Sequence, residues 1–175
     1  MRHVLAVLFF SLFTFNFSLL TASAQDDPQD IAPPPITAMS KDERSRLEGE
    51  TDLKLRTKLE LGMMNDRLMA AEKLHSSEDY DGLFRELGAF QGLMDNGLDY
   101  LLKHDTGSGK VLDNFKRLEI GLRGFGPRLE MIRRELPIRY EDYVRKLIKY
   151  VRDARSKAID PQFGDTVLPK QKPSP

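Results

Sequence analysis

Residues 111–137 read VLDNFKRLEIGLRGFGPRLEMIRRELP, and this stretch determines the class of fold. Its apolar side chains recur at alternating steps of four and three residues, the spacing that places side chains on one face of an α-helix. Eight residues share this face: Val111, Phe115, Leu118, Leu122, Phe125, Leu129, Ile132 and Leu136. Pro137 then ends the predicted helix, because a proline pushes the residue before it out of the α region.

Three further segments show helical spacing. The first runs from a capping box at Ser40 and Glu43 to about His75, the second spans residues 78–104, and the third spans 139–159. Four amphipathic helices with short connections and no strand pattern predict an all-α, antiparallel four-helix bundle. At ~1.5 Å per residue the first helix would be about 50 Å long, so it is expected to overhang its neighbours. Its broad apolar face comprises Leu47, Leu55, Leu59 and Met63, followed by Leu61, Met64, Leu68 and Ala71.

The first 24 residues have the organisation of a secretory signal peptide. A short basic start precedes an apolar run from Val4 to Leu20, and Ala22 and Ala24 stand at the A-x-A positions of a cleavage site. We expect export and cleavage after Ala24; the alternative is an uncleaved anchor, since the run is near the lower length limit for a membrane span. The chain has no cysteine, which excludes disulfides and a lipid-modified cysteine, and no glycosylation sequon follows the signal. These features favour a bacterial periplasmic or secreted protein.

Prolines flank the predicted helical domain on both sides. Residues 25–39 contain three consecutive prolines and are expected to form an extended linker, whereas residues 160–175 form a tail that is expected to be disordered. The predicted organisation is therefore a signal peptide at 1–24, a proline-rich linker at 25–39, a helical domain at 40–159 and the tail at 160–175.

The balanced total of 27 basic and 27 acidic residues hides an asymmetry between the two halves of the chain. Residues 26–105 hold 18 acidic and 10 basic side chains, whereas residues 106–175 hold 9 acidic and 16 basic ones. The acidic first hairpin is therefore expected to pack on the basic second hairpin with opposite charges along the contact.

A basic cluster surrounds the last predicted turn between helices, with tyrosines among its members: Arg133, Arg134, Arg139, Arg145, Lys149 and Arg152. One interpretation is a face that binds anionic groups or a partner, since basic and aromatic side chains together suit lipid headgroups and other anions. The other interpretation is a solvated face that balances the acidic hairpin.

Glycines interrupt two of the predicted helices. Pro127 removes one helical hydrogen bond, but the apolar spacing continues past it, so we expect one kinked helix at Gly124, Gly126 and Pro127. These small residues either allow close helix packing or form a notch for a ligand or a moving neighbour. Gly88 and Gly92 would let another helix approach closely, although this spacing also occurs without such a role.

One segment resembles the helical hairpin of a tetratricopeptide-type repeat. The resemblance is carried by Leu68, Ala70, Ala71, Leu74, the triplet Asp79-Tyr80-Asp81, Leu83 and Leu87. Hairpins of that family bind peptides and partner proteins, so the resemblance implies an interaction surface, although no second copy follows at the ~34-residue period of the family. The whole chain resembles the exported all-helical bacterial proteins of unknown function, which implies no activity.

The sequence contains no constellation for catalysis or metal binding. Glu72 and His75 have the Glu-x-x-His spacing of bundle di-metal sites, but such sites need a second copy of that motif. The other histidine after the signal, His104, ends the next helix, so the two histidines lie at opposite ends of a hairpin. The sequence has no phosphate-binding loop, no Ser/His/Asp order of a catalytic triad and no nucleophilic cysteine. We therefore predict that the protein is not an enzyme and has neither a cofactor nor a nucleic-acid partner.

The leading hypothesis is an exported, soluble helical interaction or scaffold module of the cell envelope, with a protein or envelope component as its partner. No transmembrane span is expected after signal cleavage. The alternative is a binder of anionic ligands, lipid headgroups or envelope polymer through the basic cluster, which would include peripheral membrane contact. Ionic strength separates the two hypotheses, because a charge-driven site weakens steeply with added salt.

Overall fold

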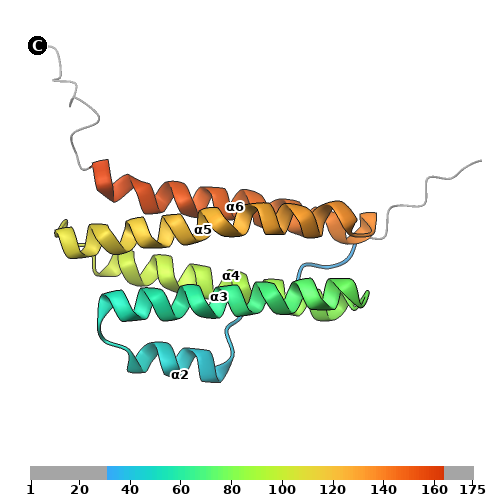
Figure 1. Cartoon of the computed structure of the whole chain (residues 1–175), viewed down its shortest axis with the longest axis horizontal. Helices are drawn as coiled ribbons and strands as arrows, with labels where there is room; N and C mark the ends of the chain where they lie inside the picture. The colour runs from blue at the N-terminus through green and yellow to red at the C-terminus, as the bar shows by residue number, and fades with distance from the viewer. Residues whose placement is uncertain (1–30, 164–175) are drawn as a thin grey trace, which may run out of the picture. The chain divides into compact units, whose positions relative to one another are not determined.

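The computed structural model describes residues 31–163, so the predicted signal peptide with its cleavage site at Ala24 lies outside it, as does the tail from residue 164. The described part is all-α, with helices α2 (Lys41–Gly49), α3 (Leu53–Ser76), α4 (Tyr80–Lys103), α5 (Gly109–Glu135) and α6 (Ile138–Phe163). Helices α3 to α6 lie side by side and alternate in direction along the chain (Figure 1). The prediction of an all-α, antiparallel helical bundle is therefore confirmed.

The predicted first helix is two helices, and the expectation that it overhangs the bundle is wrong. Helix α2 ends at Gly49, and Glu50 has an extended backbone with φ −95° and ψ 110°. Asp52 then caps α3, because its side chain accepts hydrogen bonds of 2.9 Å from the backbone amides of Lys54 and Leu55. The chain turns back at this break, so α2 lies alongside α3 (Figure 1).

Helix α2 is fixed to the bundle by its own cap and by an arginine of α3. The predicted capping box is present: Ser40 accepts from the amide of Glu43 at 3.2 Å, and Glu43 accepts from the amide of Ser40 at 2.7 Å. The second oxygen of Glu43 contacts the Arg67 guanidinium at 2.8 Å, and Arg67 also reaches Glu86 of α4 at 2.8 Å. One guanidinium thus joins three helices.

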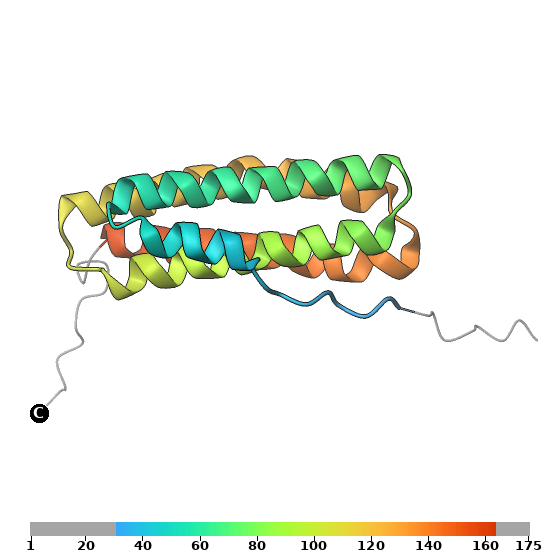
Figure 2. The same ribbon diagram turned by 90° about the horizontal axis from the view of Figure 1, so that it is seen from below.

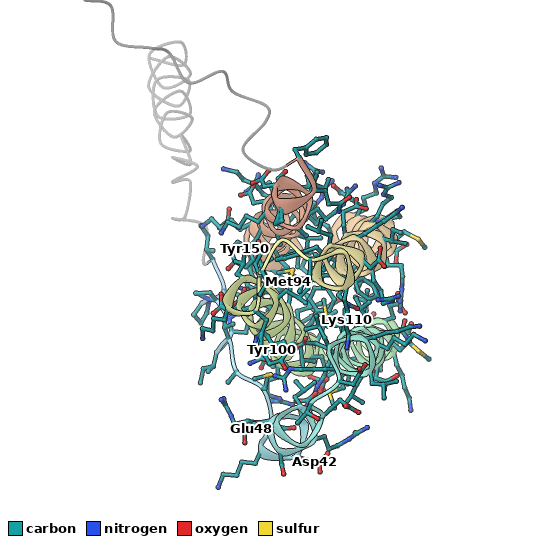
Figure 3. All side chains as sticks on the ribbon, turned by 90° about the vertical axis from the view of Figure 1, so that its left-hand side faces the viewer. Asp42, Glu48, Met94, Tyr100, Lys110 and Tyr150 are labelled. Carbon is teal, nitrogen blue, oxygen red and sulfur yellow. The ribbon has the colours of Figure 1, made fainter. Side chains whose placement is uncertain are left out.

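The hairpins α3–α4 and α5–α6 bury their apolar faces against each other in one core. Every residue of the predicted α5 face is buried, with at most 9% of its surface exposed. The α6 face is buried in the same way, through Val144, Leu147, Val151, Ala154 and Ala158. Seen along the bundle, Met94 lies among α4, α5 and α6 (Figure 3), and it is fully buried. The regular apolar spacing therefore corresponds to the core-facing side of each helix.

Residues 31–39, the described part of the predicted linker, pack on the bundle; we call this segment the strap. The strap has no regular secondary structure and runs along α4 before it enters α2 (Figure 2). The backbone amide of Ala32 donates a 2.9 Å hydrogen bond to the carbonyl of Arg139 in α6. Farther along, the strap passes over Gly88 and Gly92 of α4. The two glycines therefore admit an extended segment, whereas the interpretations from the sequence were close approach of a helix or no role.

Helix α5 continues through Pro127 as one helix, as its apolar register predicted. A Cβ atom added to Gly124 or Gly126 would find no neighbour within 4 Å, so close helix packing in the glycine-containing segment 121–127 does not occur at these two positions. Close packing occurs instead at Gly121, where an added Cβ would clash with a methyl group of Leu61 in α3.

Replacement of Pro127 by alanine is expected to leave the fold intact and to raise the free energy of unfolding by roughly 1–3 kcal/mol. Pro127 is exposed, and an alanine amide could donate the helical hydrogen bond to the carbonyl of Arg123 that proline cannot make. Urea unfolding followed by circular dichroism measures the change. A clear loss of stability would show that packing requires the geometry of the proline ring.

The C-terminal boundary of the last helix also differs from its prediction. Helix α6 reaches Phe163, with Pro161 in its final turn, so the first residues of the predicted tail are helical. Between residues 31 and 163, no helix is both long enough and apolar enough to cross a membrane.

Candidate functional site

A surface hollow of about 580 Å³ lies where the strap meets the starts of α4 and α6; we call it the strap hollow. The three prolines at 33–35 and Ile36 line it on the strap side, and Phe84, Arg85 and Tyr140 line it on the helix side. Its position follows from local sequence features. Pro137 ends α5 and starts α6 with Ile138, and the cap at Asp79 starts α4 close by.

Aromatic rings from α4 and α6 pack against one another at the strap hollow, where Phe84 and Tyr140 line the helix side together with the charged Asp81, Arg85 and Arg139. The ring centroid of Phe84 lies 5.1 Å from that of Tyr140 and 5.0 Å from that of Tyr143, and the Tyr80 centroid lies 5.1 Å from that of Tyr140. Such distances are favourable for tilted and edge-to-face pairs. The hydroxyl of Tyr143 donates to Gln91 at 3.2 Å, and burial, together with the charge of Asp95, raises the pKa of Tyr143 above its usual range.

Three exposed isoleucines line the strap hollow or are chain neighbours of its lining residues, and we call them the apical patch. Ile36 has 87% of its surface exposed, Ile138 has 67% and Ile31 has 56%. The hydrogen bond between Ala32 and Arg139 joins the chain neighbours of Ile31 and Ile138, and Ile36 lies farther along the strap at the hollow itself. Exposed aliphatic side chains beside a hollow can contact another molecule.

The structure brings together three of the six residues of the predicted basic cluster. Arg133, Arg145 and Arg152 line a second hollow of about 280 Å³ between α5 and α6, together with Glu130 and Glu141. Arg134 and Lys149 are exposed outside this hollow. Arg139 belongs to the strap hollow instead, and its guanidinium carbon lies 5.1 Å from the ring centroid of Tyr140.

Carboxylates of the same hairpin neutralise the three clustered arginines. Arg133 contacts Glu130 at 2.9 Å and also forms an ion pair with Glu141. Arg152 contacts the other oxygen of Glu130 at 3.3 Å, and Arg145 contacts Asp142 of its own helix at 2.7 Å. This arrangement favours the interpretation of a charge-balanced face, although the balancing carboxylates come from α5 and α6 and not from the acidic first hairpin.

Direct charge pairing between the two hairpins is found at other basic residues. Arg128 of α5 binds both oxygens of Glu72 in α3, at 2.6 and 2.7 Å, and its third nitrogen donates to Asn65 at 2.8 Å. At the opposite end of the bundle, Lys110 contacts Asp52 at 3.3 Å. The Arg128 contact is a bidentate pair, the geometry in which an ion pair is strongest.

The sequence did not predict the buried polar cluster that lies between α3 and α4. Glu60 is only 2% exposed, and its Oε1 atom is buried without a hydrogen-bond partner. The carboxyl group occupies the space above Gly97, where an added Cβ would stand 2.5 Å from Oε2. Burial raises the pKa of Glu60 to about 8, against the opposing charge of Arg56. The structure therefore stabilises the neutral form of this carboxyl group.

Arg56 lies one helical turn before Glu60 and connects the same region to α2. Its guanidinium donates to the carbonyl of Leu47 at the end of α2 and to Asn96 at 2.9 Å. The guanidinium carbon stacks 4.0 Å from the ring centroid of Tyr100, which lies on the side of α4 that faces α2 (Figure 3). Its Nε atom is buried without a hydrogen-bond partner.

A second buried carboxylate, Glu119, has the opposite electrostatic environment. It is 4% exposed, and it accepts hydrogen bonds from Arg155 of α6 at 2.8 Å and from Arg123 at 3.0 Å. Burial alone would raise the pKa of Glu119, but these two guanidinium groups outweigh burial and hold the pKa below its usual value. Glu119 is therefore buried in its charged form.

His75 and His104, the two histidines after the predicted signal peptide, do not form a shared site. His75 lies 3.8 Å from Glu135, whereas His104 contacts the carbonyl of Tyr100 at 2.7 Å at the other end of α4. Residues 31–163 contain no group of three or more side chains that could hold a metal ion.

Comparison of the chain with protein-family models, with curated proteins and with solved structures finds no match.

Proposed function

We propose that this protein is an exported, non-catalytic helical module of the cell envelope that binds a protein partner at the end of the bundle carrying the strap hollow. The observation that carries the proposal is the apical patch: three isoleucines, each more than half exposed, at or next to a hollow that Phe84 and Tyr140 help to line. Burial of exposed apolar side chains under a partner lowers the free energy, and this favours formation of the complex. The tetratricopeptide-like resemblance of the α3–α4 hairpin points to the same class of function.

A photo-crosslinking amino acid at position 138 tests the binding surface in intact cells. We expect a discrete crosslinked product at Ile138 and at Ile36, and none at Met69, a matched control on α3 that is 55% exposed. Ile36→Asp should remove the product formed at position 138, because an aspartate in the patch must lose water on contact. Equal products at all three positions, or none at any, would contradict the proposal.

The predicted signal peptide at residues 1–24 supports export. The mass of the chain recovered from the cell envelope tests whether this peptide is removed. We expect a polypeptide that begins at Gln25, the residue after the A-x-A cleavage site. An intact Met1 would instead support the uncleaved anchor.

A second candidate function, binding of anionic ligands, has the α5–α6 hollow as its specific observation. Three arginines line that hollow, but each of them also contacts a carboxylate. We therefore expect no co-sedimentation of the protein with anionic lipid vesicles at low or at physiological salt. Sedimentation that disappears on addition of salt would support the second candidate, because only a charge-driven contact is screened in that way. The charge-reversal variant R145E/K149E/R152E would then lose it.

A further inference from the structure

The strap lies on α4 in the way that an extended peptide lies in a binding groove. The carbonyl oxygen of Ile36 stands 2.5 Å from the place where a Cβ of Gly88 would be, and the backbone of Ala38 stands 3.2 Å from the corresponding place at Gly92. Any side chain at position 88 would displace the strap from this path. The two glycines thus form a groove, which we call the α4 groove, that fits main-chain atoms.

The walls of the α4 groove suit proline in particular. The Cβ of Pro35 packs 3.2 Å from the same point at Gly88, and the rings of Phe84 and Tyr140 line the hollow beside the prolines. Aromatic walls are the usual partners of extended proline-containing segments, which are stiff before binding and lose little entropy on binding. The Ala32 amide adds a directional main-chain contact to the carbonyl of Arg139.

The strap fills this site only in part. A hollow of about 580 Å³ remains between the strap and α4 and α6, and Ile36 points away from the groove with 87% of its surface exposed. Among the described residues, one backbone hydrogen bond ties the strap to α6. A ligand with side chains that enter the hollow would make contacts that the strap does not make.

We propose that the α4 groove binds an extended, proline-containing segment of a partner protein, and that the strap is the intramolecular occupant which this segment displaces. The inference rests on the proposed function, because it assigns a ligand class to the protein partner. Displacement of the strap would carry Ile31 and Ile36 away and leave Ile138 of the apical patch in place on α6. A strap joined to its own bundle acts at an effective concentration in the millimolar range, so it lowers the apparent affinity for a competing segment.

A labelled synthetic peptide with the sequence of residues 31–39 tests the proposal by fluorescence anisotropy on the full-length protein. The strap is loosened with Ala32→Glu, which places a charge at a position that is 6% exposed, or with Ala32→Pro, which removes the amide donor. We expect at least tenfold tighter binding of the peptide to either variant than to the wild type. Circular dichroism verifies that each variant is folded. If Ala32→Glu unfolds the protein, the peptide is measured on Ala32→Pro instead.

Two further substitutions in the loosened background locate the binding site. Gly88→Ala should abolish peptide binding, because its Cβ would occupy the space of the bound backbone. Gly124→Ala is the matched control: it is also a helical glycine, but its Cβ would meet nothing within 4 Å, so binding should be unchanged. A peptide with glycines in place of the three prolines should bind at least tenfold more weakly.

The proposal is overturned if neither loosened variant binds the peptide more tightly than the wild type, or if Gly88→Ala leaves the binding unchanged. Such a result, with the crosslink at Ile138 retained, would remove the α4 groove as a site and leave the proposed function standing. The reverse result, peptide binding without any crosslink at the apical patch, would confirm the groove and remove the proposed function.

Discussion

Replacement of Glu60 by glutamine is expected to raise the free energy of unfolding by about 3–5 kcal/mol at pH 9 and to change it little at pH 5. The pKa of this carboxyl group rises from an ordinary value near 4.5 to about 8 in the fold, because burial penalises the charge. The neutral carboxyl therefore stabilises the wild type fully below about pH 4.5, and this contribution is lost as the pH rises to about 8. Glutamine is neutral at every pH, so the variant keeps this contribution to stability at pH 9.

Urea unfolding between pH 5 and pH 9 measures this difference, and Glu119→Gln is the matched control. The pKa of Glu119 is lowered, so its contribution to stability is present at neutral pH and is lost as the pH falls. Glu119→Gln should thus destabilise the protein at pH 7, with the effect shrinking toward acid. A difference in stability between the wild type and Glu60→Gln that does not grow between pH 5 and pH 9 would contradict the raised pKa of Glu60.

Truncation of Leu122 to alanine is expected to lower the free energy of unfolding by roughly 2–5 kcal/mol, the range for a buried leucine. Leu122 has no exposed surface, and it lies at the middle of the α5 face that packs against the core. The surrounding helices cannot fully close the cavity, so the cost includes lost contacts as well as lost burial.

The neighbouring Ile120 supplies the control for this experiment. It is 55% exposed on the outer side of the same helix, so Ile120→Ala should cost less than about 1 kcal/mol. Thermal or urea unfolding of both variants gives the comparison. Equal losses at the two positions would contradict the assignment of the α5 face to the core.

Helical periodicity made the α5 face predictable, because eight apolar residues in one register leave no other arrangement that buries them together. The break before α3 was harder to predict, since Ser40 to His75 can be read as one continuous amphipathic pattern. A trace of the break was present: the apolar residues of that segment follow two registers, and Leu55, which belongs to the first, is 52% exposed. Gly49 and the capping residue Asp52 mark the break itself, which falls inside the first register, between Leu47 and Leu55.

The candidate site was less predictable than the fold, because its parts come together only through tertiary contacts. Sequence proximity grouped six basic residues, but it could not show that Glu130 and Asp142 neutralise three of them. A usable signal did exist in α4, which contains glycines at 88, 92 and 97. Each helical glycine costs about 1 kcal/mol relative to alanine, so several in one helix indicate that other groups approach its backbone. Here those groups are the strap and the Glu60 carboxyl.

The hydrogen bond from Ala32 to Arg139 sets an order of events during synthesis. The strap leaves the ribosome before any helix of the bundle, whereas the carbonyl that receives its amide belongs to the last helix to emerge. The strap can therefore contact Gly88 and Gly92 of α4 earlier, but this hydrogen bond cannot form before the first turn of α6 is present. Protection of the Ala32 amide against hydrogen exchange therefore reports that the final hairpin has closed on the first.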